Sequence, residues 1–173
     1  MTTVAALLQL LIAVAFLTIP LIRHRFGNTA KDAAEAELTR QGVPTTVLAE
    51  NKLSFDASGH ETIVPASVAA VMITLAVLNL AGSHWGQTLT WIFQSIVLVG
   101  NLLILHSQLT AAKSVQAAFA RKGDPMLQRI DVPALLKAAE SGFPRWVFPI
   151  AQNVRHAIVI GGSSLALVLV TLA

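Results

Sequence analysis

The chain of 173 residues has no cysteine and no tyrosine, and only 12% of its residues are charged. The absence of cysteine excludes disulfides, thiolate metal sites and a cysteine nucleophile. The scarcity of charge argues against a soluble domain, because about 25% of the residues in soluble domains are charged. A mean hydropathy of +0.67 instead indicates a membrane protein, which we treat as a single domain over residues 1–173.

Charge is missing altogether from four apolar runs, at residues 4–22, 63–81, 88–106 and 156–173. Each run is long enough to cross a ~30 Å hydrocarbon core as an α-helix that rises ~1.5 Å per residue. We therefore predict an all-α integral membrane fold. It would be a four-helix transmembrane bundle with short helices in two charged loops, 23–62 and 107–155.

The 12 Lys and Arg and the 9 Asp and Glu residues all lie in these two loops. Four crossings place both loops on one side of the membrane, and the excess of positive charge marks that side as cytoplasmic. We predict a multi-pass protein of the bacterial plasma membrane with both termini outside. The bases alternate with acids, which favours a topology signal over a nucleic-acid surface, so we expect no nucleic-acid partner.

Several signals predict structure in the first charged loop. Pro20, in the last turn of the first span, predicts a kink at the membrane exit, although a neighbouring helix could also accommodate it. We expect a separate helix to follow over 30–40, capped at Thr29. We expect residues 45–61 to be irregular, to lie against the headgroup region in part and to contain a turn at 56–59.

The second charged loop carries clearer signals. Helix-forming residues continue from the third span to residue 121, which predicts a helical stalk that ends at Gly123. Asp131 and Pro133 predict a helix over 132–141. Its apolar face requires a partner, which could be the stalk, the bilayer surface or another protein. Residues 143–149, rich in proline and aromatics, predict an interfacial elbow.

Four carboxamides recur at seven-residue spacing in the third span and its extension: Gln87, Gln94, Asn101 and Gln108. They share one stripe of a helix. A carboxamide within a bilayer requires a hydrogen-bond partner, so the stripe predicts helix packing. The alternative is the wall of a polar path or a ligand site. Asn79 lies near the outer end of the second span, and the short hairpin could bring it to Gln87.

The fourth span offers small residues as a contact face. Ala157 with Gly161, and Gly162 with Ala166, form small-xxx-small pairs. Such pairs allow close approach of another helix, within the chain or across an oligomer.

Histidine is the one residue type that could support haem or a metal. His24, His106 and His156 fall at the charged ends of three spans, where they could converge. We interpret them mainly as interfacial side chains. The spans contain no acids or bases, which argues against a proton pump or an ion-coupled transporter.

The layout resembles that of the trimeric membrane glutathione-transferase family, with four spans, a long first cytoplasmic loop and Glu61-Thr62-Ile63-Val64-Pro65 at the start of the second span. The family's arginine-rich entry to that span and its arginine and tyrosine pattern on the third span are missing. We therefore transfer no activity and no residue from it.

Our first hypothesis is a small non-catalytic subunit or assembly factor of a larger bacterial membrane complex, or a homo-oligomer. It would dock through its transmembrane and cytoplasmic helices. The alternative is a small membrane enzyme or a binder of lipid, quinone or haem at the cytoplasmic interface. A third hypothesis is a transporter or channel lined by Gln94 and Asn101.

Overall fold

The computed structural model describes residues 1–55 and 60–172, apart from the side chain of His60, and this part of the chain contains helices and no strand. Four helices are long and apolar enough to cross a membrane: α1 (Thr2–Arg40), α3 (His60–Leu80), α4 (His84–Lys122) and α7 (Asn153–Thr171), the last preceded by η1 (Val147–Gln152). The predicted all-α fold with four membrane-spanning helices is confirmed, and with it a multi-pass membrane location.

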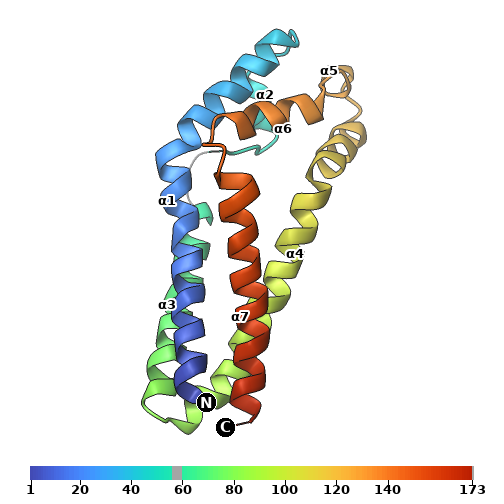
Figure 1. Ribbon diagram of the computed structural model, residues 1–173. Coiled ribbons are helices and arrows are strands. Elements are labelled where there is room, and N and C mark those ends of the chain that lie inside the picture. The colour runs from blue at the N-terminus through green and yellow to red at the C-terminus, as the bar shows by residue number, and fades with distance from the viewer. Residues whose placement is uncertain (56–59, 173) are drawn as a thin grey trace.

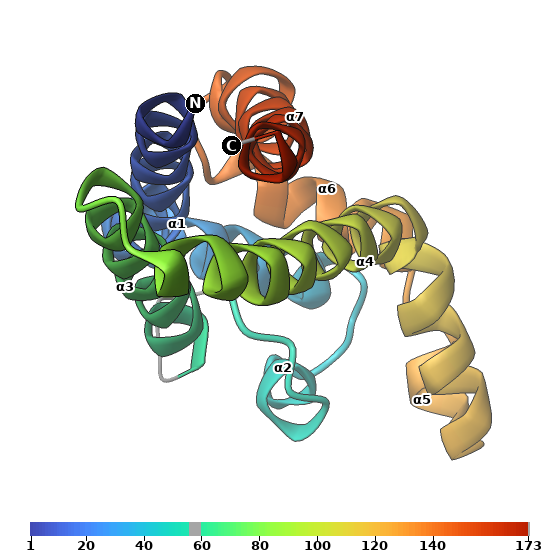
Figure 2. The ribbon, with the colours of Figure 1, turned by 90° about the horizontal axis from the view of Figure 1, so that it is seen from below.

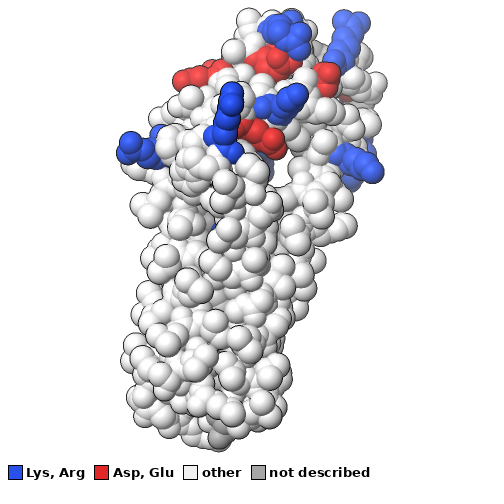
Figure 3. All heavy atoms as spheres, viewed as in Figure 1, with Lys and Arg blue, Asp and Glu red and all other residues white. Residues whose placement is uncertain are grey.

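The four helices are not equivalent in their packing. The spanning part of helix α1 lies between α3 and α7 and contacts both, whereas α4 contacts α7 and, near the α3–α4 turn, α3. Figure 1 shows α4 diverging from α7 away from the two termini, and in Figure 2, seen from below, α4 is strongly tilted relative to α1 and α7. Both termini lie beside the α3–α4 turn, at what we call the terminal end. Lys, Arg, Asp and Glu gather at the other, charged end (Figure 3).

Helix α1 is continuous from Thr2 to Arg40 with Pro20 inside it, so the predicted separate helix capped at Thr29 is wrong. Proline removes one backbone donor from a helix, but packing on both sides of it stabilises the helical conformation. Phe16 is buried in the spanning part, and Ala30 and Leu38 are buried at the charged end. Residues 30–40 are helical as expected, but they prolong the first span.

In the second charged loop, the predicted stalk and the predicted helix over 132–141 are confirmed. Helix α4 extends as a stalk to Lys122 and ends at Gly123, whose φ of 69° is left-handed. The short helix α5 (Pro125–Gln128) precedes α6 (Val132–Ser141). Asp131 caps α6, and its carboxylate accepts a 3.0 Å bond from the backbone N–H of Ala134. Both signals are local, which explains why sequence alone reveals them.

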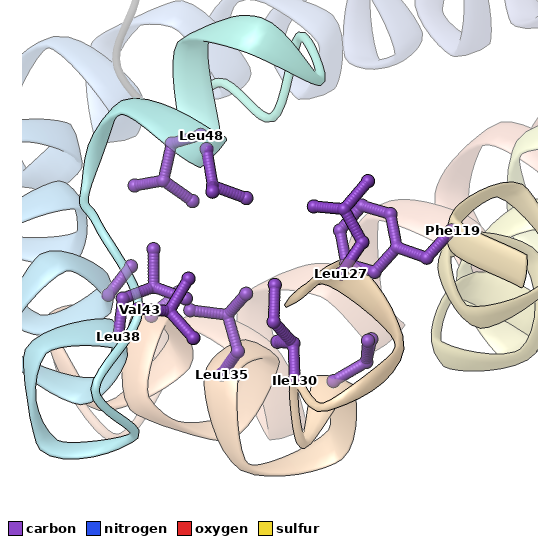
Figure 4. Packing of buried hydrophobic residues seen from close by; sticks show 11 residues of the cluster. Leu38, Val43, Leu48, Phe119, Leu127, Ile130 and Leu135 are labelled. Atoms are coloured by element: carbon purple, nitrogen blue, oxygen red, sulfur yellow. The ribbon is translucent and has the colours of Figure 1, made fainter. Parts of the chain in front are cut away.

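The charged end has a hydrophobic core of its own, which together with the helices around it we call the charged cap. Its buried residues come from α1, the following turn, α2 (Thr46–Glu50), the stalk, α5 and α6 (Figure 4). They are Ala34, Leu38, Val43, Val47, Leu48, Phe119, Leu127, Ile130, Val132, Leu135 and Ala139. Two expectations change as a result. Residues 46–50 are helical and pack inside the cap, and the apolar face of α6 packs mainly against α1.

A polar latch joins the end of α1 to the start of α6. Arg40 donates two bonds to the Glu37 carboxylate, at 2.8 and 2.6 Å, and the Gln41 side-chain amide donates a third at 2.7 Å. The Gln41 carbonyl in turn accepts a 2.8 Å bond from the backbone N–H of Asp131. These bonds, those from Arg40 first, lower the pKa of Glu37 to about 2.

The predicted elbow is present but shorter than expected. The chain is non-helical over 142–146, and Phe143 meets Phe148 edge to face with 5.3 Å between ring centroids. Val147 to Gln152 then form one turn of π-helix that contains Pro149 and continues into α7. The predicted turn at 56–59 lies outside the described residues.

Candidate functional site

The carboxamide stripe of α4 faces the neighbouring helices and bonds to them. Gln94 is fully buried, and its side-chain amide donates a 2.8 Å bond to the hydroxyl of Ser163 on α7. The carbonyl oxygen of Gln94 has no partner among the described residues. The bond lies midway along the apolar part of α4 and joins α4 to α7 in the buried interior.

Nearer the charged end, His156 of α7 bridges two further members of the stripe. The Asn101 amide nitrogen lies 3.3 Å from His156 Nδ1, and His156 Nε2 lies 2.8 Å from the carbonyl oxygen of Gln108. Because an amide nitrogen only donates and a carbonyl only accepts, this arrangement requires a neutral imidazole with its proton on Nε2. Gln152 donates a second bond, 2.7 Å long, to the same Gln108 oxygen.

A third polar cluster lies toward the terminal end and joins three helices. Asn79 of α3 donates to the Gln9 carbonyl of α1 at 3.0 Å and to the Thr90 hydroxyl of α4 at 2.9 Å, and the Gln9 amide also donates to Thr90 at 3.0 Å. All three side chains are buried. Asn79 therefore bonds to Thr90 and Gln9, and the expected contact with half-buried Gln87 is not among the described bonds.

These three clusters form what we call the polar ladder, the residues Gln9, Asn79, Thr90, Gln94, Ser163, Asn101, His156, Gln108 and Gln152. Its chemistry is neutral amides, hydroxyls and one imidazole, bonded to one another. Such a set suits cohesion between helices more than acid–base work, because every described bond uses a group in its neutral form. Sequence reasoning overlooked Gln9 and Thr90, although each is a polar residue inside an apolar run.

The three histidines singled out from the sequence have different environments. His156 is 5% exposed and engaged in the ladder, whereas His24 and His106 are exposed. Within the described part of the chain, no three histidine, aspartate or glutamate side chains form a group able to hold a metal ion. Haem or metal ligation by His156 would require it to give up its bonds to Asn101 and Gln108.

The small-residue face of α7 is divided between two directions. Ala166 is fully buried, and a Cβ added to Gly162 would lie 3.3 Å from Ile12 of α1, so this half contacts the bundle. Ala157 and Gly161 are exposed, and a Cβ on Gly161 would meet nothing within 4 Å. The pair of Ala157 and Gly161 is thus open for contact outside the chain.

A groove of about 390 Å³ lies between α1 and α7. Its walls are aliphatic side chains of the two helices, among them Leu11, Val14, Leu21, Ile22, Val154 and Ile158. The exceptions are Thr18, Trp146 at one end and Arg155, which is the one charged residue of the lining. Sequence reasoning assigned no role to Arg155, because its position beside an apolar wall depends on how α1 and α7 pack.

Arg155 is partly buried and makes no hydrogen bond or ion pair with any residue in the described ranges. Its charged neighbour is Arg23 of α1, which forms an ion pair with Glu61 of α3. The groove therefore combines a long apolar wall with an uncompensated cation near the charged end.

Comparisons of the chain with protein-family models, with curated proteins and with solved structures found no match in any of the three. The similarity of layout to the membrane glutathione transferases gains no support from them.

Proposed function

We propose that the protein is a small non-catalytic subunit or accessory factor of a larger membrane complex. It would dock through the outward face of α4 and through the helices of the charged cap. We place it in the bacterial plasma membrane with the cap in the cytoplasm and both termini outside, since all of its Lys and Arg residues are at the charged end.

The observation that carries this proposal is the low coverage of α4. Only 17% of the residues in its most apolar stretch are buried, against 33–39% in the other three spanning helices. Trp91, Ile96 and Leu103 are among its exposed side chains, at 47%, 60% and 65% exposure. Because the polar stripe of α4 is bonded inside the bundle, the face that remains is long and apolar and is available for van der Waals packing against a helix of another protein.

The chemistry of the described residues supports an assembly role in a second way. The described hydrogen bonds of the buried amides join the helices of the bundle to one another, and the cap has its own packed core. A rigid bundle with an open helix on one side is suited to hold a neighbour in place. The cap helices would add a polar, charged surface to the same partner.

The test is site-specific photo-crosslinking in native membranes. A photoreactive residue replaces Ile96 or Leu103 on α4, and the matched control replaces Val77 on α3, which is 59% exposed. We expect a discrete adduct from the α4 positions and none from the control. Coexpression of two differently tagged copies distinguishes a second copy of the chain from another protein. A monodisperse monomer without adducts at either α4 position would contradict the proposal.

A binder of lipid, quinone or haem at the cytoplasmic interface is the second candidate, and the groove beside Arg155 favours its lipid form. Haem is disfavoured, because both ring nitrogens of His156 already have partners. An absorbance spectrum and native lipid mass spectrometry of protein from its own host would test this candidate. Absence of a chromophore and of a defined lipid, with unchanged behaviour of a variant lacking all three histidines, would contradict it.

A transporter lined by Gln94 and Asn101 is the third candidate. The two side chains are 0% and 3% exposed and bonded to α7, so a path along them would require α4 and α7 to separate. Flux into liposomes that is unchanged in Gln94→Leu would argue against it.

A further inference from the structure

We propose that the groove between α1 and α7 binds one anionic phospholipid, with its phosphate on Arg155 and an acyl chain along the apolar wall. This site is separate from the face of α4 used in the proposed function. The inference rests on shape, on charge and on the position of the groove in the chain.

The shape suits a hydrocarbon chain. Along α1 the groove extends from Leu11 to Ile22, which is roughly 16 Å at ~1.5 Å per helical residue. Val154 and Ile158 of α7 form the opposite wall. An elongated apolar groove of this kind offers an alkyl chain contact on two sides, whereas a compact polar solute would find little to bond to.

The charge selects the headgroup. Arg155 is the one cation in the lining, is partly buried beside the apolar wall, and has no hydrogen-bonding partner among the described residues. Arg23 lies close enough to repel it and is itself paired with Glu61. A phosphate monoanion would compensate Arg155 through charge-assisted bonds that a guanidinium can make in pairs.

The position suits a lipid whose headgroup faces the charged end. Arg155 lies in the first turn of α7, which follows the elbow and η1, and the half-exposed Trp146 also lines the groove. Tryptophan at a membrane boundary and a basic pocket between helices on the cytoplasmic side are both typical of sites for anionic headgroups.

Trp146 also provides the probe. In the full chain with Trp85→Phe and Trp91→Phe, the remaining tryptophan fluorescence reports on the groove. Two sets of phosphatidylcholine nanodiscs would be compared, each with the same fraction of a lipid that carries brominated acyl chains. The brominated lipid is phosphatidylglycerol in one set and phosphatidylcholine in the other. Bromine quenches tryptophan fluorescence on contact. We expect brominated phosphatidylglycerol to occupy the site about fivefold more readily than brominated phosphatidylcholine. This is the factor by which one arginine near an anionic lipid surface favours binding.

Variants separate the site from bulk lipid. Arg155→Gln should abolish the preference and Arg155→Lys should retain part of it, while Arg145→Gln, a neighbouring exposed arginine outside the lining, should leave it unchanged. Val14→Phe, which fills the apolar wall and leaves Arg155 in place, should reduce quenching by phosphatidylglycerol to the level of phosphatidylcholine. Circular dichroism confirms that each variant is folded.

Three results would overturn the proposal. The first is equal quenching by the two lipids in the parent protein. The second is a preference that survives both Arg155→Gln and Val14→Phe. The third is displacement of the lipid by soluble glycerol phosphate at millimolar concentration, which would assign Arg155 to a free phosphate ester and leave the groove without a role.

Discussion

The side-chain amide of Gln94 on α4 donates a 2.8 Å hydrogen bond to the hydroxyl of Ser163 on α7, and both residues are fully buried. This pair is the middle member of the polar ladder. Since α4 is the least covered spanning helix, its orientation depends on few contacts, and polar bonds with a defined geometry are the most specific of them. The ladder thus explains how an obliquely crossing helix can have one defined position.

We expect Gln94→Leu to destabilise the protein by about 0.6–2 kcal/mol, because an interhelical bond is lost and Ser163 is left without it. Unfolding by SDS in mixed micelles, followed by circular dichroism, measures the effect. Ser163→Ala completes a double-mutant cycle, whose coupling energy isolates the bond. Gln87→Leu is the control, since Gln87 has the same chemistry on the same helix and no described bond. Equal effects of Gln87→Leu and Gln94→Leu would be inconsistent with the ladder.

We expect Gly86→Ala to separate α3 from α4 and to lower stability. A Cβ at this position would lie 2.9 Å from the backbone carbon of Leu78 and 3.0 Å from the backbone nitrogen of Asn79. Backbone atoms cannot rotate away, so the helices must shift and the bonds of Asn79 must lengthen, at a cost of about 1–3 kcal/mol.

Gly100→Ala is the matched control in the same SDS unfolding assay, because nothing lies within 4 Å of its added Cβ. We expect this change to be neutral or to stabilise by up to about 1 kcal/mol through helix propensity. If Gly86→Ala were as harmless as Gly100→Ala, the close approach of α3 and α4 would be refuted.

The latch at Glu37 predicts a pH dependence for the charged cap. The pKa of Glu37 is lowered from 4.5 to about 2, so the folded state binds this proton less readily than the unfolded state. The resulting stabilisation is fully present above pH 4.5 and is lost as the pH falls toward 2. Thermal unfolding of the parent and of Glu37→Gln should differ by a constant amount between pH 7 and 5, and the difference should shrink below 4.5. A difference that stayed constant down to pH 2 would contradict the latch.

The proposed orientation predicts which end of the molecule is accessible from outside the cell. Because the chain has no cysteine, His84→Cys and Lys113→Cys each introduce one thiol, at exposed positions of the terminal end and of the charged end. We expect a membrane-impermeant maleimide to label His84→Cys in intact cells and Lys113→Cys only after permeabilisation. The reverse pattern would place the charged cap outside.

Helix capping and hydropathy, which are local properties, were sufficient to predict the stalk of α4 and the helix that follows Asp131. They failed at α1, where the Thr29 cap signal indicated a second helix and packing produced one continuous helix. The same limitation applies to α2, because Val47 and Leu48 are helical and buried only in the presence of α1, α5 and α6. Local signals decide a helix end when little else contacts it, and tertiary burial can override them.

For the candidate sites, the sequence identified the carboxamide stripe of α4 but not the residues that bond to it. Gln9 and Thr90 are 81 positions apart in the chain and Gln94 and Ser163 are 69 apart, so no spacing rule connects them. Likewise, a half-buried arginine beside an aliphatic wall has no sequence signature, because Arg155 belongs to the last spanning helix and Leu11 to the first.

The amino-acid sequence by itself determined that this protein has four spanning helices, with every charge at one end, because the cost of placing charge in hydrocarbon shows directly in composition and run length. Only the tertiary structure decided that α1 stays continuous, that the polar stripe of α4 bonds within the chain, and that Arg155 borders an apolar groove. These features depend on contacts between distant segments, and a free energy that arises from such contacts is absent from any single stretch of sequence.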